Sequence, residues 1–286
     1  MFVIIGIVIV LGGVLGGYLG ENGNISLLIQ PHEYIIIFGA ALGGFVIASP
    51  LKVIKAVQAG FVRMFKSRAY SKKDYLDALL LLSDIFYKIR KEGLVSIEAD
   101  LDGPEKSPIF KNHLSFIKNH HALAFLTDTL RTLTITDIEA HEMGELLDYE
   151  IEAHYEEALI PSKSIANVAD ALPGLGIVAA VLGIVLTMKK IDAPPAVLGG
   201  CIGAALVGTF TGVLMCYGFV GPMAKNLENI ANEDKEFLTV IKAGLLSFMS
   251  TPSPQVAIEF ARRVVPEELR PTFLELENMV KQSRKK

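Results

Sequence analysis

The chain has 286 residues, of which 51% are hydrophobic and only 20% are charged, and its formal net charge is −4. An average soluble domain has about 45–50% apolar residues even when glycine is counted, and about 25% charged residues. The composition therefore excludes a disordered chain, a highly charged coiled coil and a module that binds nucleic acid through excess basic charge.

Four stretches of the chain contain no Asp, Glu, Lys or Arg: 1–20, 34–51, 171–188 and 193–224. A transmembrane helix needs about 20 mostly apolar residues, so each stretch predicts one span. We expect the first stretch to be a span and not a cleavable signal peptide. It lacks a basic segment before the apolar run and an A-x-A-like cleavage site, and three further spans follow it.

The polar segments show the spacing of apolar residues that is typical of helices. Residues 51–66 place Lys52, Lys55, Arg63 and Lys66 on one face, which predicts a helix along the membrane surface with its cations near lipid headgroups. Further helices are predicted at 74–91, 121–133, 137–158, 255–264 and 271–282.

Two details of these helices follow from local residue preferences. Asp74 is the expected N-cap of the helix at 74–91. Residues 100–108 are expected to form a loop, because Gly103, Pro104 and Pro108 interrupt regular structure. The sequence contains no strand pattern of convincing length. The predicted fold class is therefore all-α, an integral membrane protein with four transmembrane helices and a large helical cytoplasmic domain.

The distribution of basic residues predicts the orientation in the membrane. Residues 52–73 are rich in Lys and Arg, whereas residues 21–33, between the first two spans, have neither. Cytoplasmic loops carry an excess of Lys and Arg, so the polar segments and both termini are predicted to be cytoplasmic. Lys189 and Lys190, in the other short connection, oppose this assignment but are outnumbered.

The predicted organisation has four parts. Residues 1–51 hold the first two spans and a short periplasmic loop, and 52–169 form a cytoplasmic helical domain. Residues 170–223 hold the third and fourth spans, and 224–286 form a cytoplasmic helical tail.

Patterns typical of soluble enzymes are missing. His141, Glu142 and Glu145 give H-E-x-x-E, which lacks the second histidine of a zinc protease. No P-loop motif occurs, and the two cysteines, Cys201 and Cys216, are too few for a disulfide scaffold or a multi-cysteine zinc site. We therefore expect no enzyme activity, no cofactor and no metal.

Small residues form a stripe along each of the last two predicted spans. The stripes consist of Gly176, Ala180, Gly183 and Thr187, and of Ala205, Thr209, Gly212 and Cys216. Small residues let helices approach closely in a bilayer, so close packing explains most of these positions. Thr209 lies in the middle of its run, near the membrane midplane. Its hydroxyl either bonds the backbone four residues back or faces another helix or a hydrated path.

Pro173 and Pro222 flank the third and fourth spans on their predicted cytoplasmic side. Each either ends a helix or acts as a hinge. We expect no Asp, Glu, Lys, Arg or His inside any of the four spans. Proton and cation paths normally require an ionisable group in the membrane, so a partner would have to supply it.

Several motifs occur in the order found in one family. They are LGGVLGGYLGENG, QPHEYIIIFGAALGGFV, DALPGLGIVAAVLGIV, LVGTFTGVLMCYGFVGPMA, VAIEFARRVV and RPTFLELE. The chain resembles the flagellar motor stator family MotA through these motifs, essentially from end to end. The ExbB/TolQ energising proteins are more distantly similar, and they usually have three spans where this chain has four.

The resemblance implies an assembly in the bacterial inner membrane, in which five MotA-like chains surround two MotB-like chains. Each MotB-like chain supplies one membrane aspartate, and ion flow turns the pentamer so that it acts on the rotor switch protein FliG. Arg90 and Glu98 match the torque charges of the family. Pro173 and Pro222 match its proline pair, and Thr209 matches its midplane hydroxyl.

The resemblance also bears on the ion. Sodium-driven relatives carry a threonine at the position that matches Ala180, which lies near the middle of the third span. Alanine offers no oxygen to replace the hydration of Na⁺, which favours protons. Two other functions stay open: an ExbB/TolQ-like energising channel subunit for envelope transport, and a purely structural membrane scaffold.

Overall fold

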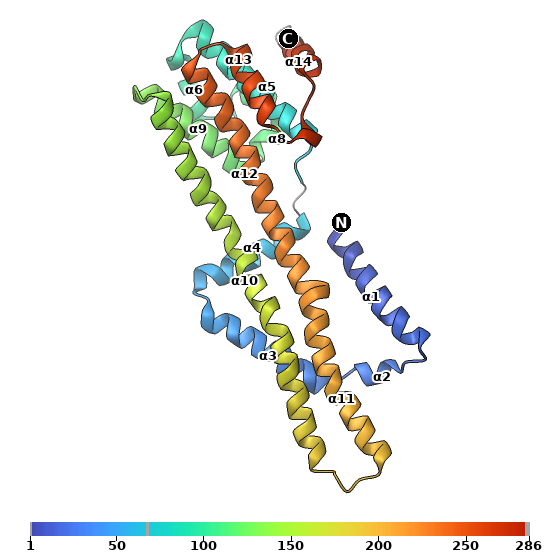
Figure 1. Cartoon of the computed structure of the whole chain (residues 1–286). Helices are drawn as coiled ribbons and strands as arrows, with labels where there is room; N and C mark the ends of the chain where they lie inside the picture. The colour runs from blue at the N-terminus through green and yellow to red at the C-terminus, as the bar shows by residue number, and fades with distance from the viewer. Residues whose placement is uncertain (1, 67–68, 284–286) are drawn as a thin grey trace. The chain divides into compact units, whose positions relative to one another are not determined.

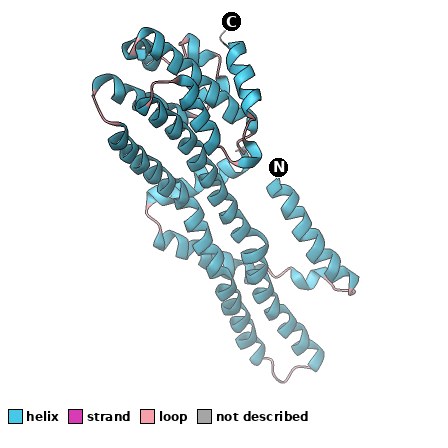
Figure 2. Cartoon of the chain, turned by 45° about the horizontal axis from the view of Figure 1, so that its top comes forward, coloured by secondary structure: helices cyan, strands magenta, loops and turns pink. Residues whose placement is uncertain are grey.

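The computed structural model describes residues 2–66 and 69–283. These residues form helices joined by short connections, with no strand among them, which confirms the all-α prediction (Figure 2). By its internal contacts the chain divides into two units. The membrane unit comprises Met1–Ser67 and Ala158–Ile230, and the polar unit comprises Arg68–Glu157 and Ala231–Lys286.

The helices of the membrane unit include those predicted from the charge-free runs. The full set in this unit is α1 (Phe2–Gly20), α2 (Ile25–Leu28), α3 (Pro31–Ala48), α4 (Leu51–Lys66), the later part of α10 (Ala140–Met188), α11 (Pro195–Leu214), the π-helical η2 (Met215–Val220) and the start of α12 (Gly221–Ser250). Four helical stretches of the described residues are long and apolar enough to cross a membrane, which confirms the four predicted spans. Large apolar side chains remain exposed on them, with Ile47 at 90%, as a lipid solvent requires.

Small side chains and few large ones form the interior of the membrane unit. Ile37 and Ala41 of α3 pack with Leu172 and Ala179 of α10. The helix α4 lies where it was predicted, and its apolar residues Val57 and Met64 pack against α10 and α12. Lys52 and Lys55 are exposed on its other face, and the side chain of Lys66 lies outside the described residues.

The polar unit contains the remaining helices. They are α5 (Lys72–Glu92), η1 (Leu94–Ile97), α6 (Glu98–Asp102), α7 (Pro108–Lys111), α8 (Leu114–Ile117), α9 (His120–Ile135), the first part of α10, the later part of α12, α13 (Pro254–Val264), η3 (Glu267–Leu269) and α14 (Phe273–Ser283). In Figure 1, α13 lies beside α5.

Two local predictions for this unit were wrong. Ser71 is the N-cap of α5, and Asp74 is the third helical residue, whose carboxylate accepts hydrogen bonds from the Ser71 backbone N–H (2.8 Å) and hydroxyl (2.6 Å). This is a capping box, in which two residues three apart satisfy the helix start together. The segment 100–108 is not wholly a loop, because α6 continues to Asp102 before Gly103 ends it.

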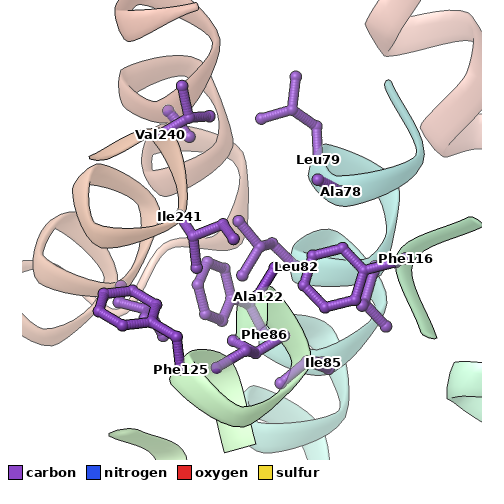
Figure 3. Close-up of a cluster of buried hydrophobic side chains, with 14 of the residues drawn as sticks. Ala78, Leu79, Leu82, Ile85, Phe86, Phe116, Ala122, Phe125, Val240 and Ile241 are labelled. Atoms are coloured by element: carbon purple, nitrogen blue, oxygen red, sulfur yellow. The ribbon is translucent and has the colours of Figure 1, made fainter. Parts of the chain in front are cut away.

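The helix α5 forms the centre of the polar core. Figure 3 shows Leu82, Ile85 and Phe86 of this helix among Phe125 of α9 and Ile241 of α12. The rings of Phe86 and Phe248 are stacked with their centroids 4.3 Å apart. Burying each such side chain stabilises the fold by about 1.5–3 kcal/mol, so this core holds the unit together.

Candidate functional site

Glycines hold α10 and α11 in direct backbone contact. A Cβ atom placed on Gly176 would lie 2.7 Å from the carbonyl oxygen of Gly208, and one on Gly183 would lie 2.8 Å from the Cβ of Ala205. Real Cβ atoms do not approach so closely, so only glycine fits at both positions. The predicted close packing of the two small-residue stripes is confirmed at these positions, and Gly208, outside both stripes, belongs to the same contact.

The two midspan residues predicted to line an ion path lie on this helix pair. Ala180 is buried against α11, with its backbone nitrogen 3.3 Å from where a Cβ on Gly208 would be. Thr209 is half-buried, and within the described part of the chain its hydroxyl makes no hydrogen bond. Thr187, by contrast, donates to the carbonyl of Gly183 four residues back.

Neither proline ends a helix. Pro173 lies inside the 49-residue helix α10, so the alternative that it marks a helix end was wrong. Pro222 is the second residue of α12, directly after the π-helical η2, in which the N–H of Gly221 donates to the carbonyl of Cys216. Single π-helical turns inside helices occur frequently at functional sites. Both prolines thus lie in helical backbone, where neither can donate a hydrogen bond to the carbonyl four residues back.

The membrane unit contains a carboxyl group that the sequence reasoning missed. Glu33 lies in the first turn of α3, within the span, and is only 9% exposed. The prediction that no span contains an ionisable residue was therefore wrong for the second span. The helix starts at Pro31, before the charge-free run begins, because proline is well suited to the first helical position.

Arg90 and Glu98, the predicted torque charges, lie in the polar unit and are both exposed. Arg90 is in the last turn of α5, and its guanidinium donates a hydrogen bond to the carbonyl of Pro252, in the connection between α12 and α13. Glu98 is the first residue of α6. The structure thus orients Arg90 through a contact 162 residues away in sequence.

A buried histidine in the polar unit, His113 in the connection between α7 and α8, contacts two aspartates of α5 and was not predicted. The Nδ1 atom of His113 lies 2.7 Å from Asp77 Oδ1, and its Nε2 atom lies 3.4 Å from Asp84 Oδ2. Burial of the ring lowers the pKa of His113, but the hydrogen bonds and charges of both aspartates outweigh it and raise the pKa to about 9. Burial raises the pKa of Asp77, but hydrogen bonds from His113 and Ser115 outweigh this and lower it overall.

We expect the polar unit to lose stability in alkaline conditions because of His113. A raised folded-state pKa contributes stability that is complete below the unfolded value of 6.5 and is lost as the pH rises through about 9. The loss should be on the order of 3 kcal/mol. The loss of stability is measured by following the unfolding midpoint of the purified chain as the pH is raised between these two values. His113→Gln should remove most of the dependence, whereas His141→Gln, at an exposed position, should keep it. An unchanged slope in His113→Gln would contradict the assignment.

Among the described residues, no group of three or more His, Cys, Asp or Glu side chains could hold a metal ion. The candidate functional groups are therefore the helix contacts, hydroxyl groups and carboxyl group of the membrane unit, and the surface charges of the polar unit.

Four membrane-crossing helices, a glycine-lined contact between the last two and a separate helical unit define a multi-pass membrane protein. Comparison with family models identifies the N-terminal model of motility protein A at residues 4–93 and the MotA/TolQ/ExbB proton channel family at residues 117–238. The chain belongs to the motility protein A family. This is a family of channel and motility proteins and not of enzymes.

Individual relatives agree with this assignment over nearly their whole length. Motility protein A of Salmonella typhimurium is 37% identical over 99% of this chain and 96% of its own, and that of Escherichia coli is 38% identical over 98% and 95%. Chemotaxis protein LafT of Vibrio parahaemolyticus is 32% identical over 96% of each chain.

Two solved structures share the fold. One is the structure of C. jejuni MotAB, with a TM-score of 0.78 and 18% identity, covering 95% of this chain and 98% of that one. The other is the flagellar MotAB stator complex from Bacillus subtilis, with a TM-score of 0.76 and 23% identity, covering 93% and 96%.

Proposed function

We propose that this chain is a stator subunit of a bacterial flagellar motor, which couples proton flow across the inner membrane to torque on the rotor. The observation that carries the proposal is the 37–38% identity to motility protein A of two species over at least 98% of the chain. The fold shared with the MotAB structures supports it.

The proposed assembly contains five copies of this chain around two MotB-like chains. The relatives of known structure are MotAB complexes, and a MotB-like aspartate would supply a carboxylate that residues 171–188 of α10 and 195–214 of α11 lack. The Thr209 hydroxyl, free of partners within the described chain, suits the lining of a path completed by another subunit. The polar unit would lie in the cytoplasm with both termini, where Arg90 and Glu98 contact the rotor protein FliG.

Protons are the proposed ion. The side chain of Ala180 carries no oxygen, and Thr209 supplies one hydroxyl per chain near the midplane. A proton needs a carboxyl group and a hydrogen-bonded route, whereas Na⁺ needs several oxygen ligands in place of its water. A path with one hydroxyl per chain and the partner's carboxylate meets the first requirement.

The ExbB/TolQ-like alternative shares one of the two family models. It is less well supported, because the N-terminal motility protein A model also matches and the described residues contain four candidate spans. A neighbouring gene for a MotB-like protein with a peptidoglycan-binding region would favour the stator subunit over the energising channel.

The proposal predicts that proton conduction depends on the partner. A single carboxyl enclosed by helix backbones, such as Glu33, provides no continuous route, so vesicles with this chain alone should show background proton flux. Vesicles that contain this chain together with the MotB-like partner should acidify in their interior under an imposed membrane potential. A partner whose membrane aspartate is replaced by asparagine should return the proton flux to background. Equal flux with and without the partner would contradict the proposal.

A further inference from the structure

The carboxyl group of Glu33 is the most unusual polar group of the membrane unit. Its side chain is 91% buried, and its Oε2 atom is buried without a hydrogen-bond partner. An unpartnered polar atom in a protein interior costs free energy, so such groups require an explanation. The side chain does not turn outward towards the nearby end of α3 but points between α10 and α11.

Two glycines make room for this carboxyl group. A Cβ atom on Gly208 of α11 would lie 2.5 Å from Glu33 Oε2, and one on Gly183 of α10 would lie 3.2 Å from Glu33 Oε1. Any other residue at Gly208 would therefore occupy the place of the carboxyl oxygen. The two helices form a cradle for a carboxyl group that comes from a third helix.

Among the described residues, the carboxyl group has no ion-pair partner on α3, α10 or α11. Residues 171–188 of α10 and 195–214 of α11 have no Asp, Glu, Lys, Arg or His. On α3 itself the neighbouring titratable side chains are His32, which is exposed, and Tyr34, whose hydroxyl donates to the carbonyl of Leu28. An unpaired negative charge in such a place is strongly disfavoured, so the carboxyl group must bind a cation.

The surroundings of the carboxyl group suit a proton and not a metal ion. The cradle presents glycine backbone and the methyl group of Ala179, whose Cβ lies 3.1 Å from the same Gly208 position. A sodium ion would need several further oxygen ligands at this point, whereas a proton needs only the carboxyl oxygen.

We propose that Glu33 is a proton-binding site in the membrane unit, a second membrane carboxyl that this chain contributes in addition to the one supplied by its partner. The inference rests on the proposed proton-driven function. Gly208 is adjacent in sequence to Thr209 on the proposed ion path, and Gly183 is one helical turn from Ala180. Loss of the proton would place a negative charge between α10 and α11, and this would disturb the packing of the helices that line the path.

The test is covalent labelling of the assembled complex with the apolar reagent dicyclohexylcarbodiimide. A protonated carboxyl gives its proton to one nitrogen of the reagent while its oxygen bonds to the central carbon, and the adduct rearranges to a stable N-acylurea. Peptide mass spectrometry should find Glu33 modified several-fold more than Glu21, an exposed carboxyl beyond the end of α1. Glu33→Gln should abolish this modification. It should also reduce the proton flux of the complex by a factor on the order of ten or more. Glu21→Gln should change neither.

A second pair of variants tests the cradle without touching the carboxyl group. Gly208→Ala should displace Glu33 and change the extent of its labelling, whereas Gly199→Ala, in open space on the same helix, should not. If the wild-type complex conducts protons while Glu33 stays unlabelled, or if Glu33→Gln conducts normally, the inference is wrong and the proposed function stands. If the intact wild-type complex conducts no protons at all, the proposed function itself fails.

Discussion

Replacing Pro173 with alanine is expected to abolish swimming while leaving membrane insertion and assembly intact. Pro173 lies inside α10, where it cannot donate the backbone hydrogen bond to the carbonyl of Ala169. An interior proline costs a helix about 3 kcal/mol, so alanine should stabilise the helix. If Pro173 serves as a hinge, as we propose, a stiffer helix should couple the membrane unit less well to the rotor. The measurement combines swimming speed with the thermal unfolding midpoint of the purified complex.

The chain provides a matched control for this experiment. Pro161 also lies inside α10, but its ring packs against α4, where a Cβ on Gly60 would lie 2.8 Å from the Pro161 Cβ. Pro161→Ala should therefore keep swimming, and Pro222→Ala, next to η2, should lose it as Pro173→Ala does. Normal swimming speed in Pro173→Ala would show that the proline has no role in coupling.

Exchanging the two predicted torque charges is expected to have the second large effect. The double variant Arg90→Glu with Glu98→Lys should lose most of its swimming speed while the complex still assembles. Both side chains are exposed, so reversing each charge at a helix end should cost about 0.3–1 kcal/mol. Loss of the Arg90 hydrogen bond to Pro252 should add about 0.5–1.5 kcal/mol. In the proposed function both side chains face rotor charges. Charges in salt solution act over about 8 Å at physiological ionic strength, so reversing their sign should turn attraction into repulsion.

Two comparisons make this result specific. The double reversal Glu105→Lys with Lys106→Glu, also at exposed positions of the polar unit, should leave swimming unchanged. Compensating reversals of the facing rotor charges should partly restore the Arg90 and Glu98 variant. Normal swimming of that variant would count against a torque role for the pair.

The spans and the main helices could be predicted from the sequence, because charge-free runs and helical spacing are local signals. The close contact of α10 and α11 was also predictable from small residues such as Gly176 and Gly183. This signal is also local, because small residues at helical spacing within one span indicate close packing against another helix.

The features that the sequence did not reveal depend on distant residues. His113 has its two aspartate partners 29 and 36 residues away, and Arg90 contacts Pro252 across 162 residues. Glu33 was placed outside the second span because the charge-free run starts one residue later. Its glycine cradle is formed by two other helices. Pro31 was the sequence signal that could have placed Glu33 inside the span, because proline favours the first position of a helix.

The most direct measurement of the central claim is the rotation speed of tethered cells that depend on this chain and its MotB-like partner for motility. External sodium is varied at fixed pH, and a protonophore is then added. A proton-driven stator predicts a speed that is independent of sodium and falls to zero with the protonophore. A speed that follows sodium and survives the protonophore would contradict it.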